Sequence, residues 1–332
     1  MKPLSCLLFI LLPLAAPLHA SPTLDAIRKV GVLNCGIDQS EAEFSMTDEH
    51  GPRVAFDRDL CQAYAAAILG AHARVVIQGY PDNDTALQAL QKHEVDLVAS
   101  VSDDLTHATL ANVSLTRPVL YDAQGLLVLR AAAITQLKDL DRKKICFLDQ
   151  SEAELNLQSW FTRHHLTLNP FPFQEEGEME AAFVTGNCAA LSGDLTRLAN
   201  TRAAFASRAA EYTLLPETIA ADPLATAWRS DDPQFGNVLQ WVFNLLLAAD
   251  SIDGLQPHGL TAPDNDPILV RLNGSTRELG RPLGLSDDWP AQVLAAVGNY
   301  AAILARDLGD ASPLHLPRGL LSPDTLQALP VK

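Results

Sequence analysis

Four cysteines constrain the fold of this chain more than any other feature. Cys35 and Cys61 lie in one segment with a strand, helix, strand pattern, and Cys146 and Cys188 lie in a second segment of the same kind. Sequence alone allows three pairings, and we predict the two bridges that stay within one segment. Metal ligation is the alternative, but no C-x-x-C or H-x-x-x-H spacing supports it. The cysteines therefore predict two oxidised lobes outside the cytoplasm.

Residues 1–20 have the pattern of a cleavable export signal. An apolar run from Leu7 to Pro17 is followed by the small residue Ala20, which suits a signal peptidase. The run is too short to span a membrane. A lipid anchor needs a cysteine after the run, whereas Cys6 precedes it. We expect a mature chain that begins near Ser21.

The charge of the chain disfavours one class of partner. Its formal net charge is −16 and becomes −17 once Lys2 leaves with the signal. Such an acidic balance repels nucleic acid and anionic membrane surfaces. With 332 residues, of which 48% are hydrophobic, the chain can bury a large core and should form about two domains.

Apolar runs and helical patterns alternate along both halves of the chain, which predicts mostly parallel sheets flanked by helices. The strands that we expect lie at 30–36, 75–77, 95–101, 144–147 and 188–191. The expected helices are one that Asp57 caps, one over 85–93, one over 152–163 and one that begins near Asp194.

Two further strands are predicted to cross between the lobes. Gly125–Arg130 leaves the first lobe and Leu224–Trp228 returns to it, so a cleft lies between two lobes joined by two hinge strands. Long helices over 233–250 and 288–308 then pack on the first lobe. The predicted division is a signal peptide at 1–20, lobe 1 at 21–128 and 224–332, and lobe 2 at 129–223.

Six motifs in register resemble one family, the periplasmic general L-amino-acid-binding proteins of bacterial ABC importers, within solute-binding protein family 3. The resemblance covers about residues 24 to 320 and implies a two-lobed, type II periplasmic-binding-protein-like α/β fold. The motifs are Cys35-Gly36, Phe56-Asp57-Arg58-Asp59-Leu60-Cys61, Glu94-Val95-Asp96, Tyr121-Asp122-Ala123-Gln124-Gly125, Glu154-Leu155-Asn156-Leu157 and Gly284-Leu285-Ser286-Asp287-Asp288-Trp289.

The resemblance also implies how a zwitterion is held in the cleft. In the family an arginine after the 95–102 strand forks onto the carboxylate, amides at a second-lobe helix assist, and an aspartate takes the ammonium. Asp194, in Leu191-Ser192-Gly193-Asp194, matches that aspartate. Capping of its own helix is the alternative role, and the two roles are compatible.

Two positions depart from the family pattern. His107 stands at the arginine position, and an imidazole cannot supply the bidentate fork; its alternative role is that of an ordinary surface residue. Asp149-Gln150-Ser151-Glu152 replaces a Gly-Thr-Thr type of turn. There Ser151 can donate a hydrogen bond, whereas Asp149 and Glu152 repel an anion and otherwise serve as solvated charges at a helix N-terminus.

The remaining candidates follow the first-lobe strands and are mostly acidic. An acidic cleft suits a cationic solute, such as a basic amino acid or an amine. Phe44 is expected to form an apolar wall, with a core contact as its alternative. The candidates are Asp38, Glu41, Glu43 and Phe44 in the first loop and Ser100, Ser102, Asp103 and Asp104 at the second strand end.

We therefore expect a non-enzymatic periplasmic receptor that closes on a small polar or cationic solute and presents it to a membrane ABC permease. It is expected to be a monomer, with no cofactor, metal or nucleic-acid partner. One alternative is an accessory or sensory protein with a diverged pocket. Another is a dehydratase-like enzyme in which Glu152 or His107 serves as general acid.

Overall fold

The computed structural model describes residues 21–38, 52–70, 72–251, 255–256, 259–260, 267 and 280–317. The expected export signal and the loop candidates Glu41, Glu43 and Phe44 lie outside the described residues. Nine of the described strands form one sheet in the order β2-β1-β3-β9-β4-β7-β5-β6, with β8 paired to β4. The predicted α/β class is confirmed, and the sheet is mixed. β1 pairs in parallel with β2 and β3, and β5 with β6 and β7, whereas the pairs that involve β4 or β9 are antiparallel.

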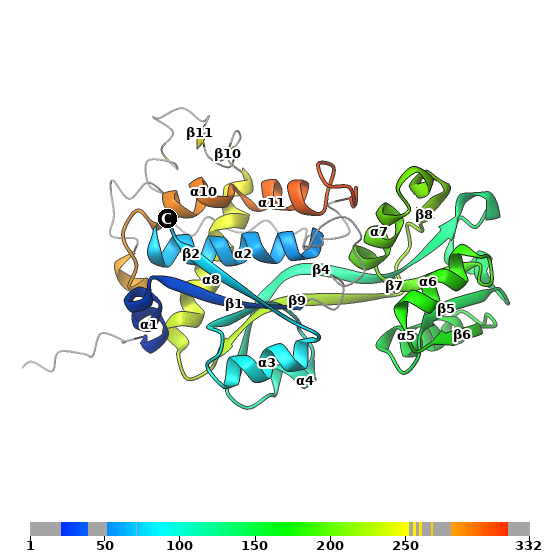
Figure 1. Cartoon of the computed structure of the whole chain (residues 1–332), viewed down its shortest axis with the longest axis horizontal. Helices are drawn as coiled ribbons and strands as arrows, with labels where there is room; N and C mark the ends of the chain where they lie inside the picture. Colours follow the sequence, from blue (N-terminus) through cyan, green and yellow to red (C-terminus); the bar gives the residue numbers. More distant parts are fainter. Residues whose placement is uncertain are drawn as a thin grey trace, which may run out of the picture.

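Lobe 1 contains the strands β1 to β3 and the helices around them (Figure 1). Its first part contains α1 (Pro22–Val30), β1 (Val32–Asp38), α2 (Pro52–Leu69), β2 (Arg74–Tyr80), α3 (Asn83–Gln91), β3 (Leu97–Ser102) and α4 (Leu105–Ala108). Its second part contains α8 (Pro233–Ala248), the pair β10 (Leu255–Gln256) and β11 (Gly259–Leu260), α10 (Trp289–Val297) and α11 (Tyr300–Asp307).

Lobe 2 repeats the alternation of strands and helices on a smaller scale. The helices α5 to α7 surround the strands β5 to β7 at the other end of the molecule (Figure 1). The elements are β5 (Lys144–Leu148), α5 (Glu152–Arg163), β6 (Asn169–Phe173), α6 (Glu176–Val184), β7 (Ala190–Asp194), α7 (Leu195–Ala204) and β8 (Tyr212–Leu214).

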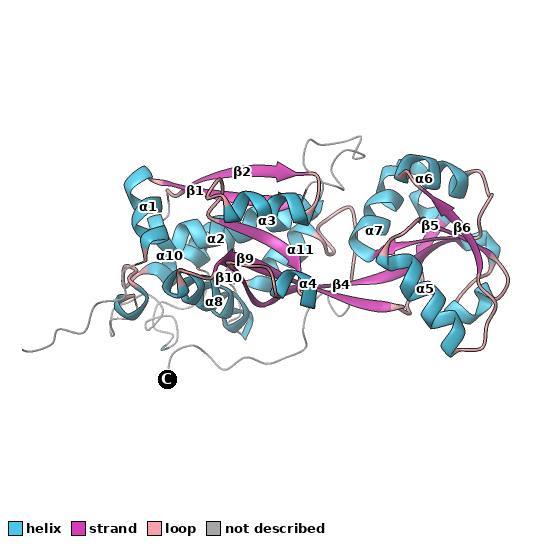
Figure 2. Ribbon diagram, turned by 90° about the horizontal axis from the view of Figure 1, so that it is seen from below, coloured by secondary structure: helices cyan, strands magenta, loops and turns pink. Residues whose placement is uncertain are grey.

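Two long antiparallel strands, β4 (Val113–Leu129) and β9 (Ala220–Arg229), run between the lobes (Figure 2). They contain the predicted crossovers, but β4 begins 12 residues before Gly125, because its first half pairs with β9 inside lobe 1. β9 also pairs with β3, and β4 pairs with β7, so the two lobes share a continuous sheet. No helix among the described residues is long and apolar enough to cross a membrane.

Three predicted boundaries were wrong. Val30 ends α1 rather than starting a strand, because Gly31 stops the helix with φ of 73°. Asp57 does not cap α2: the helix begins at Pro52, and the buried carboxylate of Asp57 accepts a hydrogen bond from Ser100. The helix expected over 288–308 is divided into α10 and α11, because Gly298 ends the first and Asn299 caps the second.

The predicted disulfide pairing is confirmed. Cys35 on β1 is bonded to Cys61 on α2, and Cys146 on β5 to Cys188 just before β7. All four residues are at most 5% exposed, so each bridge lies within the core of its own lobe.

Removal of either disulfide should destabilise its own lobe. The bridges span 26 and 42 residues, which corresponds to about 3 to 4 kcal/mol each in the chain-entropy model. We expect the Cys146→Ala, Cys188→Ala double variant to unfold lobe 2 at lower denaturant concentration than lobe 1, as followed by proteolysis of the two lobes. The Cys35→Ala, Cys61→Ala pair is the matched control and should reverse the order.

The last helices attach to lobe 1 through polar contacts as well as apolar ones. The Tyr300 hydroxyl donates to the carbonyl of Val119 at 2.6 Å, and the Nε of Arg306 donates to Asp59 on α2 at 3.0 Å. Beside this pair, burial and the Asp59 carboxylate raise the pKa of Asp307 from 3.8 to about 8, although Arg306 opposes the shift.

This raised pKa predicts a pH dependence of stability. A carboxyl group whose pKa is higher in the folded state stabilises that state at low pH, and the contribution is lost as the pH rises from about 4 to about 8. Relative to the wild type, Asp307→Asn should therefore gain in free energy of unfolding across this range and level off above it. Urea titrations at pH 4 to 9 test this, and a constant difference between the two proteins would refute it.

Candidate ligand-binding site

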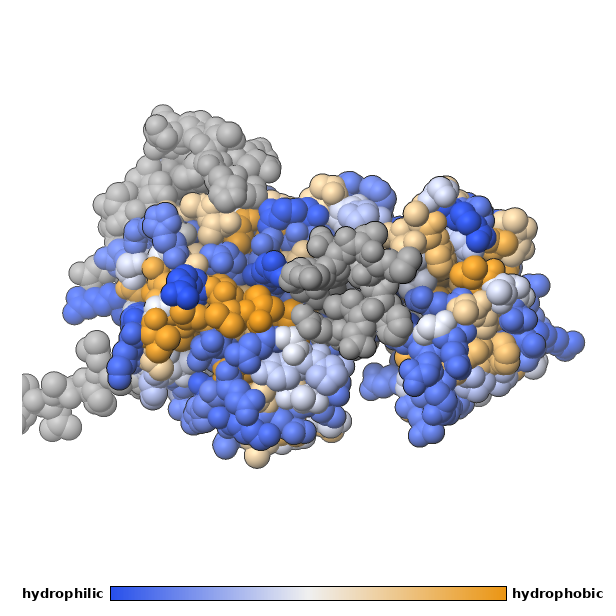
Figure 3. All heavy atoms as spheres, in the orientation of Figure 1, coloured by the Kyte–Doolittle hydropathy of each residue, from blue (hydrophilic) through white to orange (hydrophobic). Residues whose placement is uncertain are grey.

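Carboxylates from both lobes meet beside the interlobe space. The molecular surface is indented between the lobes (Figure 3). Asp38 is the last residue of β1 in lobe 1, and Asp194 is the last residue of β7 in lobe 2. Glu176 begins α6, and its pKa is affected by the charges of both Asp38 and Asp194. The carboxyl ends of β1 and β7 therefore face a common region, which is where open α/β sheets bind ligands.

Asp194 occupies the N-cap position of α7, but its side chain makes no capping hydrogen bond. Asp194 therefore stands at the capping position, but its side chain does not perform the capping role that we considered as an alternative. Its side chain is half-buried, and its backbone pairs with Gln124 on the hinge strand β4. A carboxylate held there on a rigid strand end is well placed to receive a cation.

An ion pair next to Asp194 was missed from the sequence. Nη1 of Arg197, in the first turn of α7, lies 3.4 Å from Oε1 of Glu176, and Arg197 is only 8% exposed. The spacing of three residues between Asp194 and Arg197 places both in one helical turn, which was the available signal. Nothing in the sequence indicated that Glu176 comes from the neighbouring helix.

The environment of Glu176 is strongly acidic. Desolvation is the largest cause of its raised pKa, Arg197 opposes the shift, and the carboxylates of Glu180, Asp194 and Asp38 add to it. The charge of Arg197 thus acts on Glu176 against the charges of three other carboxylates. Such a region favours a solute that brings positive charge.

The turn before α5 contains no glycine, and its Gln150 amide is not open to an anion. Gln150 adopts φ of 55°, the left-handed conformation that a glycine takes most easily. Its amide donates to the carboxylate of Glu154 at 3.0 Å. Ser151 caps α5 and donates to the carbonyl of Leu148 at 2.6 Å, whereas Glu152 is exposed. The Gln150 amide, which could otherwise donate to a bound anion, therefore already donates to Glu154.

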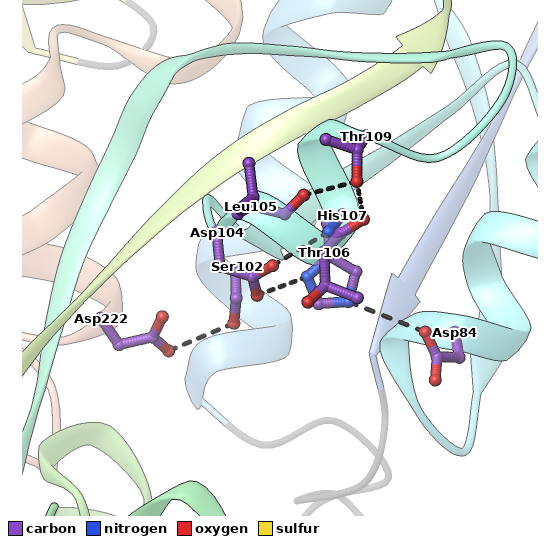
Figure 4. Close-up of polar contacts among 8 residues, drawn as sticks. All are labelled: Asp84, Ser102, Asp104, Leu105, Thr106, His107, Thr109 and Asp222. Carbon is purple, nitrogen blue, oxygen red and sulfur yellow. Dashed lines mark hydrogen bonds and ion pairs between the residues drawn. The ribbon is translucent and has the colours of Figure 1, made fainter.

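His107 is held between two carboxylates at the start of lobe 1's short helix α4 (Figure 4). Its Nδ1 donates to Asp104 at 2.7 Å, and its Nε2 lies 3.7 Å from Asp84 on α3. The side chain is 14% exposed. Both ring nitrogens thus have acidic neighbours, which ties α4 to α3.

The two serines of β3 have different surroundings. The hydroxyl of Ser102 lies 3.4 Å from the carboxylate of Asp222 on β9, and the side chain is half-buried near the hinge (Figure 4). Ser100 is 0% exposed, and its hydroxyl donates to Asp57 within lobe 1. We therefore retain Ser102 as a candidate and no longer propose Ser100. The described residues contain no group of side chains that could hold a metal ion.

Comparison with known proteins agrees with this architecture. Residues 33–260 match the bacterial extracellular solute-binding proteins, family 3. The chain belongs to this family. It is 30% identical over 315 residues to a putative amino-acid ABC transporter-binding protein, YhdW, of Escherichia coli O157:H7, covering 93% of this chain and 91% of the relative.

Two further relatives of this family 3 protein are informative. The general L-amino acid-binding periplasmic protein AapJ of Rhizobium johnstonii is 30% identical. The aligned region covers 93% of this chain and 91% of the AapJ chain. A solved periplasmic binding protein from Brucella ovis with glutathione bound is 29% identical, with a TM-score of 0.74, and covers 90% of this chain and 94% of its own.

Within this family 3 protein, the contacts of His107 predict a structural role. Replacement by alanine should lower the free energy of unfolding by about 1 kcal/mol, because a part-buried hydrogen bond to Asp104 is lost. Solute affinity should change by less than about threefold. Calorimetric titration and denaturant unfolding of the same samples test both parts, and a loss of affinity above about tenfold would restore His107 as a ligand-binding residue.

Proposed function

We propose that this protein is the periplasmic receptor of an ABC-type amino-acid importer and binds a polar or basic amino acid, or an amine, in the interlobe cleft. The observation that carries the proposal is the convergence of Asp38 from lobe 1 with Asp194 and Glu176 from lobe 2, in a family 3 solute-binding protein. Relatives with 30% identity are named as amino-acid binding proteins. On this proposal the chain is non-enzymatic, and its partner is a membrane permease.

Closure of the lobes is the signal that such a receptor gives. A solute that contacts both lobes stabilises the closed state, because the open state offers only part of the contacts. We propose lobe 1 as 21–128 and 224–332 and lobe 2 as 129–223, with β4 and β9 as hinges. We propose export by a signal peptide at 1–20, and a monomeric receptor.

The binding residues that we propose are mostly acidic. Asp194 receives the ammonium group of the solute, and Asp38 approaches from the other lobe. Ser102, Ser151, Glu152 and Phe44 remain candidates for the rim, whereas we propose a structural role for His107 between Asp104 and Asp84. A basic amino acid suits this set better than glutamate or aspartate, because an anionic side chain would meet several carboxylates.

Glutathione is a second candidate solute, because the Brucella ovis protein with glutathione bound resembles this chain in 90% of its length. Glutathione carries two carboxylates and one ammonium, so it fits the acidic cleft less well than a basic amino acid. An accessory or sensory role without transport, and a dehydratase-like enzyme, remain alternatives that the binding test separates.

A thermal-shift screen of the mature protein tests the proposal. The panel contains the twenty L-amino acids, common polyamines and glutathione. A solute at about one hundred times its Kd should add about 2.7 kcal/mol to the free energy of unfolding. We expect a basic amino acid to stabilise the wild type and to stabilise Asp194→Asn much less, with a loss of at least about tenfold in affinity.

The control variant is Asp231→Asn. Asp231 is an exposed acid that follows β9 at the end away from lobe 2, so this variant removes one charge from the acidic chain without touching the cleft. It should bind as the wild type does. Silence of a well-folded wild type across the panel would favour the accessory or sensory alternative, and a shift with glutathione alone would replace the proposed solute.

A further inference from the structure

Arg197 combines burial with incomplete hydrogen bonding. Its side chain is 8% exposed, and among the described residues its Nη1 makes no hydrogen bond, although it lies 3.4 Å from Glu176. Nη2 makes a long contact, 3.4 Å, with the carbonyl of Ser192. A buried guanidinium normally uses its donors fully, because an unmade hydrogen bond to a charged group is unfavourable. Arg197 therefore has donor capacity left for a further acceptor.

The backbone beside Arg197 is shaped to leave room for the guanidinium. Gly193 lies against it so closely that a methyl group at this position would overlap Nη2. Gly193 is also the residue before Asp194, so the guanidinium lies next to the proposed ammonium site. The two charges that a zwitterion needs are thus presented by a single turn of lobe 2.

Among the described residues, the two places where the resemblance implies a carboxylate contact are already occupied. In lobe 1, His107 lies between the carboxylates of Asp104 and Asp84. In lobe 2, the amide of Gln150 donates to Glu154. Arg197 is the buried cation of the acidic region described above, and a solute carboxylate entering that region has the strongest attraction to it.

We propose that Arg197 binds the carboxylate of the solute, in place of an arginine in lobe 1, and that it makes the cleft select basic amino acids over the amines that result from their decarboxylation. This inference rests on the proposed function. Glu176, which lies 3.4 Å from Arg197, is also affected by the charges of three further carboxylates, so negative charge is in excess there. A solute with one carboxylate and two cationic groups balances this excess better than a neutral zwitterion does. The solute carboxylate either binds the guanidinium together with Glu176 or displaces Glu176 from the guanidinium.

The competing explanation is that Arg197 only joins α7 to α6. One turn further along α7, Thr201 donates to Glu180 on α6 at 2.6 Å, so the two helices already have a second polar contact. A merely structural arginine would change stability and would weaken the binding of every solute alike. It would not change the ratio of two affinities.

The experiment is calorimetric titration of the mature protein with two matched pairs, L-lysine against cadaverine and L-arginine against agmatine. The wild type should prefer the amino acid of each pair by about tenfold to a hundredfold, as expected for a charge-assisted pair. Arg197→Gln should bring the amino acids to the affinity of their amines and leave the amines within about threefold. Arg197→Lys, which keeps the charge but not the fork, should keep part of the preference.

Two further variants separate position from charge. Gly193→Ala should displace the guanidinium and reduce the preference, although the arginine remains. Thr201→Val is the matched control, because it removes the second contact between α7 and α6 and should keep the wild-type preference. Thermal unfolding of each variant shows which of them are folded.

Each remaining outcome counts against a specific statement. An unchanged preference in a folded Arg197→Gln variant would overturn the role of Arg197 and leave the proposed function intact. Equal binding of amino acids and amines by the wild type would have the same two consequences. Failure of the wild type to bind any of the four compounds would refute the basic solute class, and the role of Arg197 with it.

Discussion

The antiparallel pairing of β4 with β9 is the constraint on which the rest of the structure depends. β9 pairs with β3 in lobe 1, and β4 pairs with β7 and β8 in lobe 2, so both lobes grow from the same two strands. The ladder is regular from Leu120 to Gln124, where it passes toward lobe 2, and shifts register on the lobe 1 side at Pro118. Asp122 in the regular part accepts a hydrogen bond from Thr196 in α7. This hydrogen bond links the hinge strand β4 directly to the first turn of α7, which follows Asp194 and contains Arg197.

Charge rather than shape distinguishes the cleft. Burial of like charges is unfavourable, and the raised pKa of Glu176 expresses this cost in lobe 2. Arg197 offsets part of it, but its guanidinium is 8% exposed and its Nη1 makes no hydrogen bond within the part of the chain that the structure describes. A bound solute that carries both positive and negative groups would stabilise both Glu176 and Arg197. A binding site that is unfavourable when empty gives a larger difference between the empty and the loaded protein.

Most of the fold could be predicted from the sequence, because hydrophobic periodicity and cysteine position are local signals. The pairing of Cys146 with Cys188 was predicted from a single strand and helix series, and the helix expected over 152–163 is α5. Errors arose where a tertiary contact overrode a local preference: Asp57 is a good cap in isolation, but here it is a buried acceptor for Ser100. The Arg197 and Glu176 pair was not predictable for the same reason, since their contact depends on how α6 packs beside α7.

The position of the cation affects how closure is driven. If the carboxylate and the ammonium of the solute both bind to the first turn of α7, lobe 2 holds the zwitterion whether the cleft is open or closed. Only contacts with lobe 1 then distinguish the two states, since a ligand shifts an equilibrium by its difference in affinity for them. In the described part of lobe 1 the carboxylate whose charge reaches Glu176 is that of Asp38. The second cationic group of a basic amino acid is suited to this contact, so the side chain of the solute, rather than its zwitterion, would decide whether the receptor closes.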